Sequence, residues 1–284
     1  MNIGIMQGRL GPPEGGRFQS FPRSGWRREI ELAAAAGLDC IEWIDDEFGL
    51  GENPLWSRSG LVELRALSAR HGVAVRSVCA DWFMENPLLR CEETEKRARV
   101  ARLCQLITIG GELDIERIVI PFVDNSRIEG DDDAQAVVRT LLEVEPVART
   151  SGVELHLETA LAPRRFAALL DRLPPATFRV NYDSGNSSSL GYSPTEEFAA
   201  YGPRVGSVHI KDRLLGGGTV ALGTGDADFP ALFRALVAHQ YRGDFILQAA
   251  RGEPGDEVEL ARRNRAFVER AAGAVEFDSL GSAT

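Results

Sequence analysis

The feature that most constrains this chain is a regular alternation of short apolar segments with longer segments of helical periodicity. The short segments are rich in β-branched residues, and in the longer ones apolar residues recur every three or four positions. The alternation predicts eight strands, over residues 3–7, 40–44, 73–79, 117–121, 153–158, 178–183, 205–210 and 245–248. The helices expected between and after them cover residues 26–36, 61–71, 93–110, 134–150, 164–173, 194–201, 229–240 and 257–272.

Strict strand and helix alternation predicts a parallel sheet of the α/β class. Glycines just before several strands, at Gly37, Gly72 and Gly152, fit the left-handed helix ends that turn the chain back. Eight units within 284 residues favour a closed (β/α)₈ TIM barrel in a single domain over residues 1–273, followed by a loose tail over residues 274–284. An open doubly wound sheet is the alternative, but neither a dinucleotide-binding glycine pattern nor a P-loop is present.

The charge balance bears on the partners of the chain. With 32 Lys and Arg against 42 Asp and Glu, the net charge is −10, which argues against a nucleic-acid partner. A small anionic substrate remains compatible, because a few basic side chains can reverse the field inside one pocket.

Targeting signals and cysteine pairs are both missing from the sequence. We find no basic segment followed by an apolar one at the start, and no uninterrupted apolar run of about 18 residues. The four cysteines form no C-x-x-C pair. We therefore expect a cytoplasmic protein without membrane partners; the oligomeric state stays open, a homo-oligomer included.

In a barrel of this kind the active site is built at the carboxyl ends of the strands. Three successive strands end on Glu158, Asp183 and His209, and the eighth ends on Gln248. Two carboxylates and an imidazole with open positions suit a divalent ion such as Mn²⁺, Co²⁺, Mg²⁺ or Zn²⁺, to which Gln248 would add a carbonyl oxygen. The competing interpretation is that helix N-termini or arginines satisfy the carboxylates, and that His209 is a hydrogen-bonded core histidine.

Further polar residues stand near the same ends. Lys211 is a catalytic candidate, and the candidates for substrate binding are Arg9, Glu42, Asp81, His156 and Arg251. His156 shares a strand face with Glu158, because side chains alternate. The Pro- and Gly-rich segment 11–23 reads either as a long loop able to cover the site or as irregular surface.

Several of these segments resemble those of sugar phosphate isomerases and epimerases with a xylose-isomerase-like barrel. The matching segments run from residue 3 to about residue 251 and comprise IGIMQGRL at 3–10, IEW at 41–43, LHLE at 155–158, NYDSGN at 181–186, VHIKD at 208–212 and LGTGD at 222–226. The resemblance implies a divalent ion held by Glu158, Asp183 and His209. It also implies chemistry on a ketose or ketose phosphate through proton abstraction beside the carbonyl.

Gln248 departs from this family pattern, because well-known epimerase branches carry a second Glu at that position. Epimerisation needs one group to remove a proton and another to return one, and an amide does neither. Three reactions stay open: isomerisation with Glu158 alone, epimerisation with another acid such as Glu42, Asp81 or Lys211, and elimination of water by a dehydratase. A non-catalytic sugar-binding or metal-binding relative is a further alternative. The DNA-cleaving branch of the fold is disfavoured by only four histidines and the net charge of −10.

Overall fold

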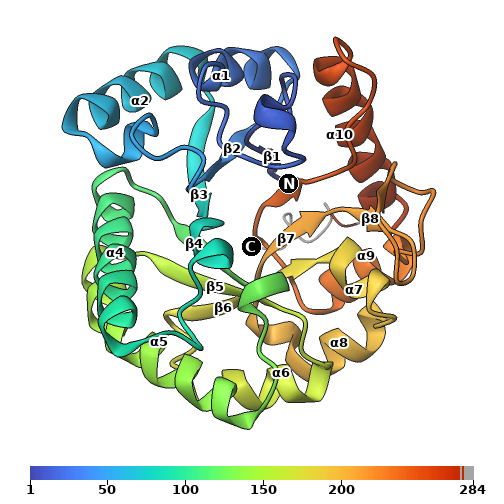
Figure 1. Ribbon diagram of the computed structural model, residues 1–284. Helices are drawn as coiled ribbons and strands as arrows, with labels where there is room; N and C mark the ends of the chain where they lie inside the picture. Colours follow the sequence, from blue (N-terminus) through green and yellow to red (C-terminus); the bar gives the residue numbers. More distant parts are fainter. Residues whose placement is uncertain (276, 278–284) are drawn as a thin grey trace, which may run out of the picture.

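Parallel strands close into a barrel, and helices form a ring around it (Figure 1). The computed structural model describes residues 1–275 and 277, so most of the tail predicted after Gly273 lies outside the described residues. In order around the barrel the eight strands are β1 (Ile3–Met6), β10 (Phe245–Leu247), β7 (Val205–Ile210), β6 (Phe178–Asp183), β5 (Glu154–Thr159), β4 (Arg117–Phe122), β3 (Ala74–Cys79) and β2 (Cys40–Ile44). The predicted (β/α)₈ barrel is confirmed.

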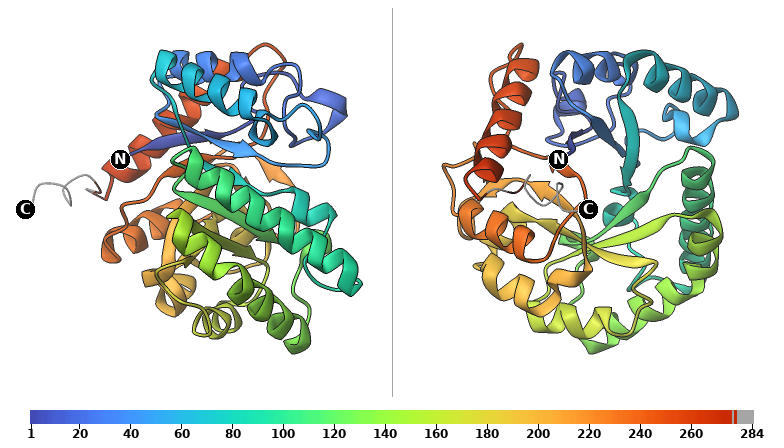
Figure 2. Two further views of the ribbon diagram at one scale, coloured as in Figure 1. Left: turned by 90° about the vertical axis from the view of Figure 1, so that its left-hand side faces the viewer. Right: turned by 180° about the vertical axis from the view of Figure 1, so that it is seen from behind.

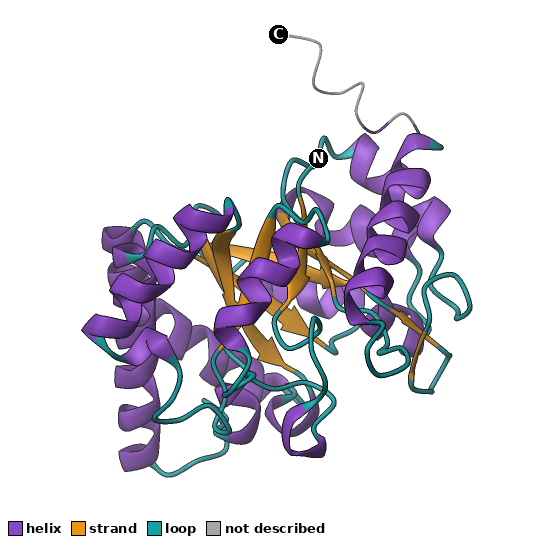
Figure 3. Ribbon diagram, turned by 90° about the horizontal axis from the view of Figure 1, so that it is seen from above, coloured by secondary structure: helices purple, strands orange, loops and turns teal. Residues whose placement is uncertain are grey.

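The helices lie outside the strands, as the view from above shows (Figure 3). Those that cover the barrel are α1 (Trp26–Ala35), α2 (Arg58–His71), α4 (Glu93–Glu112), α5 (Asp131–Ser151), α6 (Pro163–Leu170), α8 (Pro194–Tyr201), α9 (Phe229–Ala238) and α10 (Glu257–Gly273). The two longest, α4 and α5, run side by side on the outer surface (Figure 2). Within the described residues no helix has both the length and the apolar character to cross a membrane.

Short elements decorate the ends of the strands. They are α3 (Trp82–Glu85) after β3, α7 (Ser184–Ser189) directly after β6, and a hairpin of β8 (Asp212–Arg213) and β9 (Thr219–Val220) after β7. Short 3₁₀ turns cover Glu14–Gly16, Pro54–Trp56, Asp124–Ser126 and Gly202–Arg204. The sequence pattern did not predict these elements, because each is too short for a helical or strand periodicity to be recognised.

Two kinds of glycine hold the backbone in this arrangement. Gly72 and Gly152 end α2 and α5 with φ of 68° and 69°, which is the left-handed geometry expected before a returning strand. Gly4 lies where the barrel closes, and a Cβ there would collide with Cys40 Sγ and Ile246 Cδ1. Because β1 pairs with both β2 and β10, a larger residue at Gly4 would push the closing strands apart.

The amino-terminal end of the barrel carries charge pairs centred on the buried Asp244. Arg117 Nη2 at the start of β4 donates to Asp244 Oδ2 at 2.6 Å, and Arg76 Nε of β3 donates to the same oxygen at 3.1 Å. These pairs join strands from opposite parts of the chain. The carboxyl ends of the strands are left to carry the polar site.

Candidate active site

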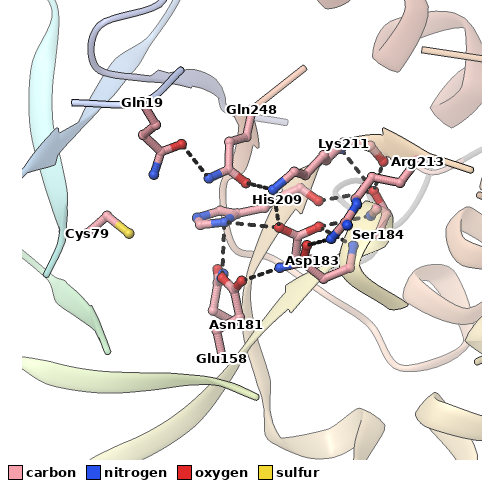
Figure 4. Close-up of polar contacts among 12 residues, drawn as sticks. Gln19, Cys79, Glu158, Asn181, Asp183, Ser184, His209, Lys211, Arg213 and Gln248 are labelled. Carbon is pink, nitrogen blue, oxygen red and sulfur yellow. Dashed lines mark hydrogen bonds and ion pairs between the residues drawn. The ribbon is translucent and has the colours of Figure 1, made fainter. Parts of the chain in front are cut away.

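Three buried side chains meet at the carboxyl ends of β5, β6 and β7 (Figure 4). Glu158, Asp183 and His209 each offer one ligand atom, and these atoms lie within 4.8 Å of one another. Asp183 stands opposite His209 in the β6–β7 register, so neighbouring strands bring the two together. The three residues are at most 7% exposed. The sequence-based expectation that they meet at one point agrees with this geometry.

Asparagines hold the Glu158 carboxylate. Asn181 Nδ2 donates to Glu158 Oε2 at 2.8 Å, and Asn186 Nδ2 donates to Oε1 at 2.6 Å. Burial alone would raise the pKa of Glu158, but the contact with His209 outweighs it and holds the pKa below its usual value. Glu158 is therefore ionised and fixed in orientation.

The two oxygens of Asp183 have different partners. Oδ1 accepts hydrogen bonds from the backbone N–H groups of Gly185 and Asn186, which caps the N-terminus of α7. Oδ2 instead faces Lys211 Nζ at 3.4 Å and His209 Nδ1 at 3.9 Å. The helix-capping interpretation thus accounts for one oxygen of this carboxylate and leaves the other directed into the cluster.

The imidazole of His209 lies between carboxylates on both sides. Its Nε2 lies 2.6 Å from Glu42 Oε1, and its Nδ1 lies 3.4 Å from Glu158 Oε2. Burial opposes a charge on the ring, but Glu42 and Glu158 outweigh burial and raise the pKa of His209 to about 10. Nδ1 itself is buried without a hydrogen-bond partner.

This donor set fits a divalent cation. The ring of His209, whose pKa the two carboxylates raise, holds a proton that balances their charge, and a divalent cation would displace this proton from Nδ1 and supply the same positive charge. Oxygen and imidazole ligands in this mixture are typical of catalytic rather than structural metal sites. Glu42 would serve to orient His209 through its second nitrogen, as carboxylates behind metal-binding histidines commonly do.

A chain of amides and an ammonium group borders the cluster (Figure 4). Gln248 Oε1 accepts a hydrogen bond from Lys211 Nζ at 3.2 Å, and Gln248 Nε2 donates to Gln19 Oε1 at 2.9 Å. Gln19 also accepts from Arg9 Nη2 and donates through Nε2 to Asp81 Oδ2 at 2.7 Å. Gln19 belongs to the segment 11–23, which therefore does reach the site.

A pocket of about 520 Å³ opens above these residues. Its lining includes Glu158, Asn186, Lys211, Arg213 and Gln248 from the later strands, and Phe18, Gln19, Cys79 and Asp81 from the earlier part of the chain. Burial raises the pKa of Asp81 to about 6 even though Gln19 and Cys79 donate hydrogen bonds to it. The pocket thus meets the metal-type cluster at Glu158 and adds further acidic, basic and amide groups.

Four other predicted substrate-binding residues lie outside the lining of this pocket. His156 is buried between Ser207 and Glu154, two residues deeper in the barrel than Glu158, so the structure does not bring it to the site. Arg251 donates to the backbone oxygens of Gly8, Gly11 and Phe18, and these hydrogen bonds tie down the loop after β1.

Glu42 and Arg9 contact residues of the site from behind: Glu42 contacts His209 of the cluster, and Arg9 contacts Gln19 of the pocket lining. Glu42 is completely buried behind His209. Arg9 is buried against the Phe18 ring, and burial together with the neighbouring Arg251 lowers the pKa of its guanidinium to about 9. Both act on the pocket through other side chains, His209 in one case and Gln19 in the other.

Gln19, Asn181 and Asn186 are site residues whose roles the sequence did not reveal. The two asparagines stand within the recognised segment 181–186, two residues before and three after Asp183. A polar residue two or three positions from a predicted metal ligand such as Asp183 is a signal for a side chain that orients the metal ligands. Gln19 had no comparable signal, because it lies in an irregular loop where no periodicity fixes the direction of a side chain.

A family model of the xylose isomerase-like TIM barrel matches residues 30–271. The chain belongs to this family. The resemblance seen in the sequence is thereby confirmed, and the matched residues include the three members of the buried cluster.

Curated relatives of this xylose isomerase-like chain carry sugar phosphate names. A protein of Escherichia coli strain K12 with the provisional name L-ribulose-5-phosphate 3-epimerase SgbU is 27% identical over 256 residues, covering 84% of this chain and 89% of the relative. A Haemophilus influenzae protein with the same provisional name is 21% identical over 238 residues, covering 78% and 83%.

Solved structures show the same fold at lower identity. An L-ribulose 3-epimerase superposes with a TM-score of 0.77 at 19% identity, covering 100% of this chain and 99% of that one. A D-psicose 3-epimerase studied in the presence of D-fructose gives a TM-score of 0.76 at 16% identity, with coverages of 96% and 100%. At these identities the likeness supports the barrel architecture.

Proposed function

We propose that the protein is a divalent-metal-dependent isomerase or epimerase that acts on a ketose or ketose phosphate. The observation that carries this proposal is the buried cluster in which His209 Nδ1, without a hydrogen-bond partner, faces Glu158 and Asp183. The names of the relatives and of the structural neighbours, which are sugar epimerases, point to the same substrate class. Four free cysteines fit a reducing cytoplasm.

The metal would be held by Glu158, Asp183 and His209, with Gln248 as a weaker fourth partner through its amide oxygen. A divalent cation bound there supplies Lewis acidity toward a sugar carbonyl oxygen. Gln248 Oε1 is 3.2 Å from Lys211 Nζ, so the amide oxygen would share its lone pairs between the ammonium and the cation.

Glu158 is the base in this proposal. It is ionised, held by two amide donors and directed into the pocket, so it can take a proton from the carbon beside the carbonyl. Lys211 lines the same pocket, where its ammonium would stabilise negative charge that develops on a substrate oxygen. The depth of the cluster limits the access of water to the reacting carbon.

The test combines metal analysis with proton exchange. Protein purified without chelator should contain one divalent ion per chain, and it should incorporate solvent deuterium beside the carbonyl of a ketose or ketose phosphate. Asp183→Ala and His209→Ala should abolish the bound metal, and circular dichroism should show that both variants keep the barrel even though loss of the α7 cap or of the Glu42 partner lowers their stability. Glu158→Gln should reduce exchange by about 10²–10⁴-fold.

Two results would contradict the proposal. Normal metal content in both ligand variants would remove the metal assignment. Absence of exchange across a panel of free and phosphorylated ketoses would remove the reaction, and a product lighter by one water would point to the dehydratase alternative.

A further inference from the structure

Inversion at a carbon beside a carbonyl needs a second proton carrier opposite Glu158. Gln248 follows β10 beside the cluster, but an amide cannot carry this proton, and both ends of the amide are engaged by Lys211 and Gln19. If the chain inverts a stereocentre, another group must return the proton.

Two of the candidate acids, Glu42 and Lys211, are engaged with other side chains. Glu42 is completely buried behind His209 and does not line the pocket. Lys211 lines the pocket, but its ammonium is directed to Asp183 Oδ2 and Gln248 Oε1. Neither group is placed to deliver a proton to carbon from the side away from Glu158.

The carboxylates among the described lining residues are Asp81, Asp124 and Glu158. Asp124 is exposed at the rim, in the turn Asp124–Ser126. Asp81 is only 6% exposed and follows β3, which is separated from the β5 strand of Glu158 by β4. Asp81 is thus the second buried carboxylate of the pocket, and it approaches from a different part of the barrel wall.

We propose that Asp81 is the second proton carrier of this site and takes the place of the carboxylate that position 248 lacks. This inference rests on the proposed function, and within it selects epimerisation. The reaction needs no oxidant or reductant, because it only moves protons.

Gln248 itself supports this assignment. Its Nε2 and Arg9 Nη2 both donate to Gln19 Oε1, so the other end of the Gln19 amide, Nε2, is turned to Asp81. A Glu at position 248 would present an oxygen to Gln19 Oε1 and disturb this orientation. The Gln248 amide and the Asp81 carboxylate are therefore linked through Gln19 in one hydrogen-bond network.

The surroundings of Asp81 suit a group that both gives and accepts protons. Its Oδ2 accepts from Gln19 at 2.7 Å, and its Oδ1 accepts from the Cys79 thiol at 3.0 Å. Burial raises its pKa to about 6, so protonated and ionised forms are both present near neutral pH.

The proton count balances over one turnover. The Glu158 carboxylate takes the proton as the C–H bond breaks, and the electron pair moves to the carbonyl oxygen. The protonated Asp81 then forms a new C–H bond on the opposite face as the pair returns. Glu158 ends protonated and Asp81 ionised, and exchange with water restores both.

The experiment measures deuterium exchange and inversion side by side in D₂O by NMR, with metal-loaded protein and a panel of ketoses and ketose phosphates. Wild type should show both. Asp81→Asn should keep exchange within a few-fold and lose inversion by about 10²-fold or more, and Asp81→Glu should recover part of the inversion. Asp171→Asn, at an exposed carboxylate outside the pocket lining, should keep both.

Metal content and unfolding midpoint establish that the variants are folded. If Asp81→Asn does not fold, Gln19→Met tests the same point, because it removes the amide donor and should lower inversion more than exchange. Inversion that persists in Asp81→Asn, or exchange and inversion that fall together, would overturn the inference. Wild-type exchange without inversion would overturn it and leave the proposed isomerase, whereas wild type with neither would overturn both.

Discussion

Glu42 Oε1 lies 2.6 Å from His209 Nε2, so the opposite nitrogen of the same ring is turned toward Glu158 and Asp183. Glu42 sits on β2 and His209 on β7, strands that are not neighbours in the barrel. The contact therefore crosses the barrel interior and fixes which ring nitrogen faces the candidate metal position.

The first prediction follows from that contact. Glu42→Gln keeps the size of the side chain but replaces the carboxylate that orients His209, so metal affinity should fall by about 10–100-fold. Titration calorimetry with Mn²⁺ or Co²⁺ measures the change. Glu197→Gln is the matched control, because Glu197 is a buried carboxylate that accepts from Tyr182, Ser187 and Tyr201 hydroxyls instead. Unchanged affinity in the Glu42 variant would show that His209 is held by packing alone.

The second prediction concerns the buried Glu29. Burial raises its pKa from 4.5 to about 7, although Gly8 and Leu10 donate backbone hydrogen bonds to it. The folded protein thus holds this proton more tightly than the unfolded chain. The stabilisation is complete below about pH 4.5 and is lost as the pH rises through about 7, on the order of 3 kcal/mol in all.

Urea unfolding between pH 5 and pH 8 tests this dependence. The free energy of unfolding of wild type should fall across the range relative to that of Glu29→Gln, which has no proton to lose at this position. Parallel profiles for the two proteins would contradict the assignment.

The third prediction concerns Arg251, for which the sequence predicts substrate binding and the structure shows contacts to a loop. Its guanidinium donates to the backbone oxygens of Gly8, Gly11 and Phe18, and Phe18 lines the pocket. Arg251→Met should therefore lower kcat/KM for free and phosphorylated sugars alike, because it loosens the loop instead of removing a phosphate contact. Arg263→Met, at an exposed arginine paired with Asp256, is the control. A loss confined to phosphorylated substrates would place Arg251 at the substrate after all.

The limits of sequence reasoning in this chain follow from distances along a strand. Side chains alternate along a strand, so the sequence grouped His156 with Glu158 on one face. Each residue advances the strand by about 3.3 Å, however, so His156 lies about 6–7 Å deeper in the barrel than Glu158. There it contacts Ser207 and Glu154 near the amino-terminal end of the strands. The alternation pattern predicts which face of the strand a side chain lies on. How deep that side chain lies in the barrel depends on how many residues separate it from the carboxyl end of the strand.

The cluster of Glu158, Asp183 and His209 was predictable because each residue stands within one position of the end of its strand. The contribution of Gln19 was not, because it depends on how an irregular loop folds over the barrel. The sequence placed Glu42 near a substrate, whereas it lies behind His209, because the contact between β2 and β7 across the barrel interior cannot be read from either strand alone.

The last prediction concerns Gln248→Glu. The substitution would add a carboxylate beside the cluster, where Lys211 can still donate to it, and would replace the N–H that now donates to Gln19 Oε1 with an oxygen. The new carboxylate would be repelled by Gln19 Oε1 and attracted by a cation in the cluster. Both effects favour metal binding, so metal affinity should rise by about tenfold, equivalent to about 1.4 kcal/mol. Gln248→Met has neither oxygen nor N–H and should bind metal no more tightly than wild type. Calorimetric titration of the three proteins with Mn²⁺ decides the matter: equal affinities in all of them would mean that the side chain at position 248 does not face the cation, and would remove Gln248 from the ligand set.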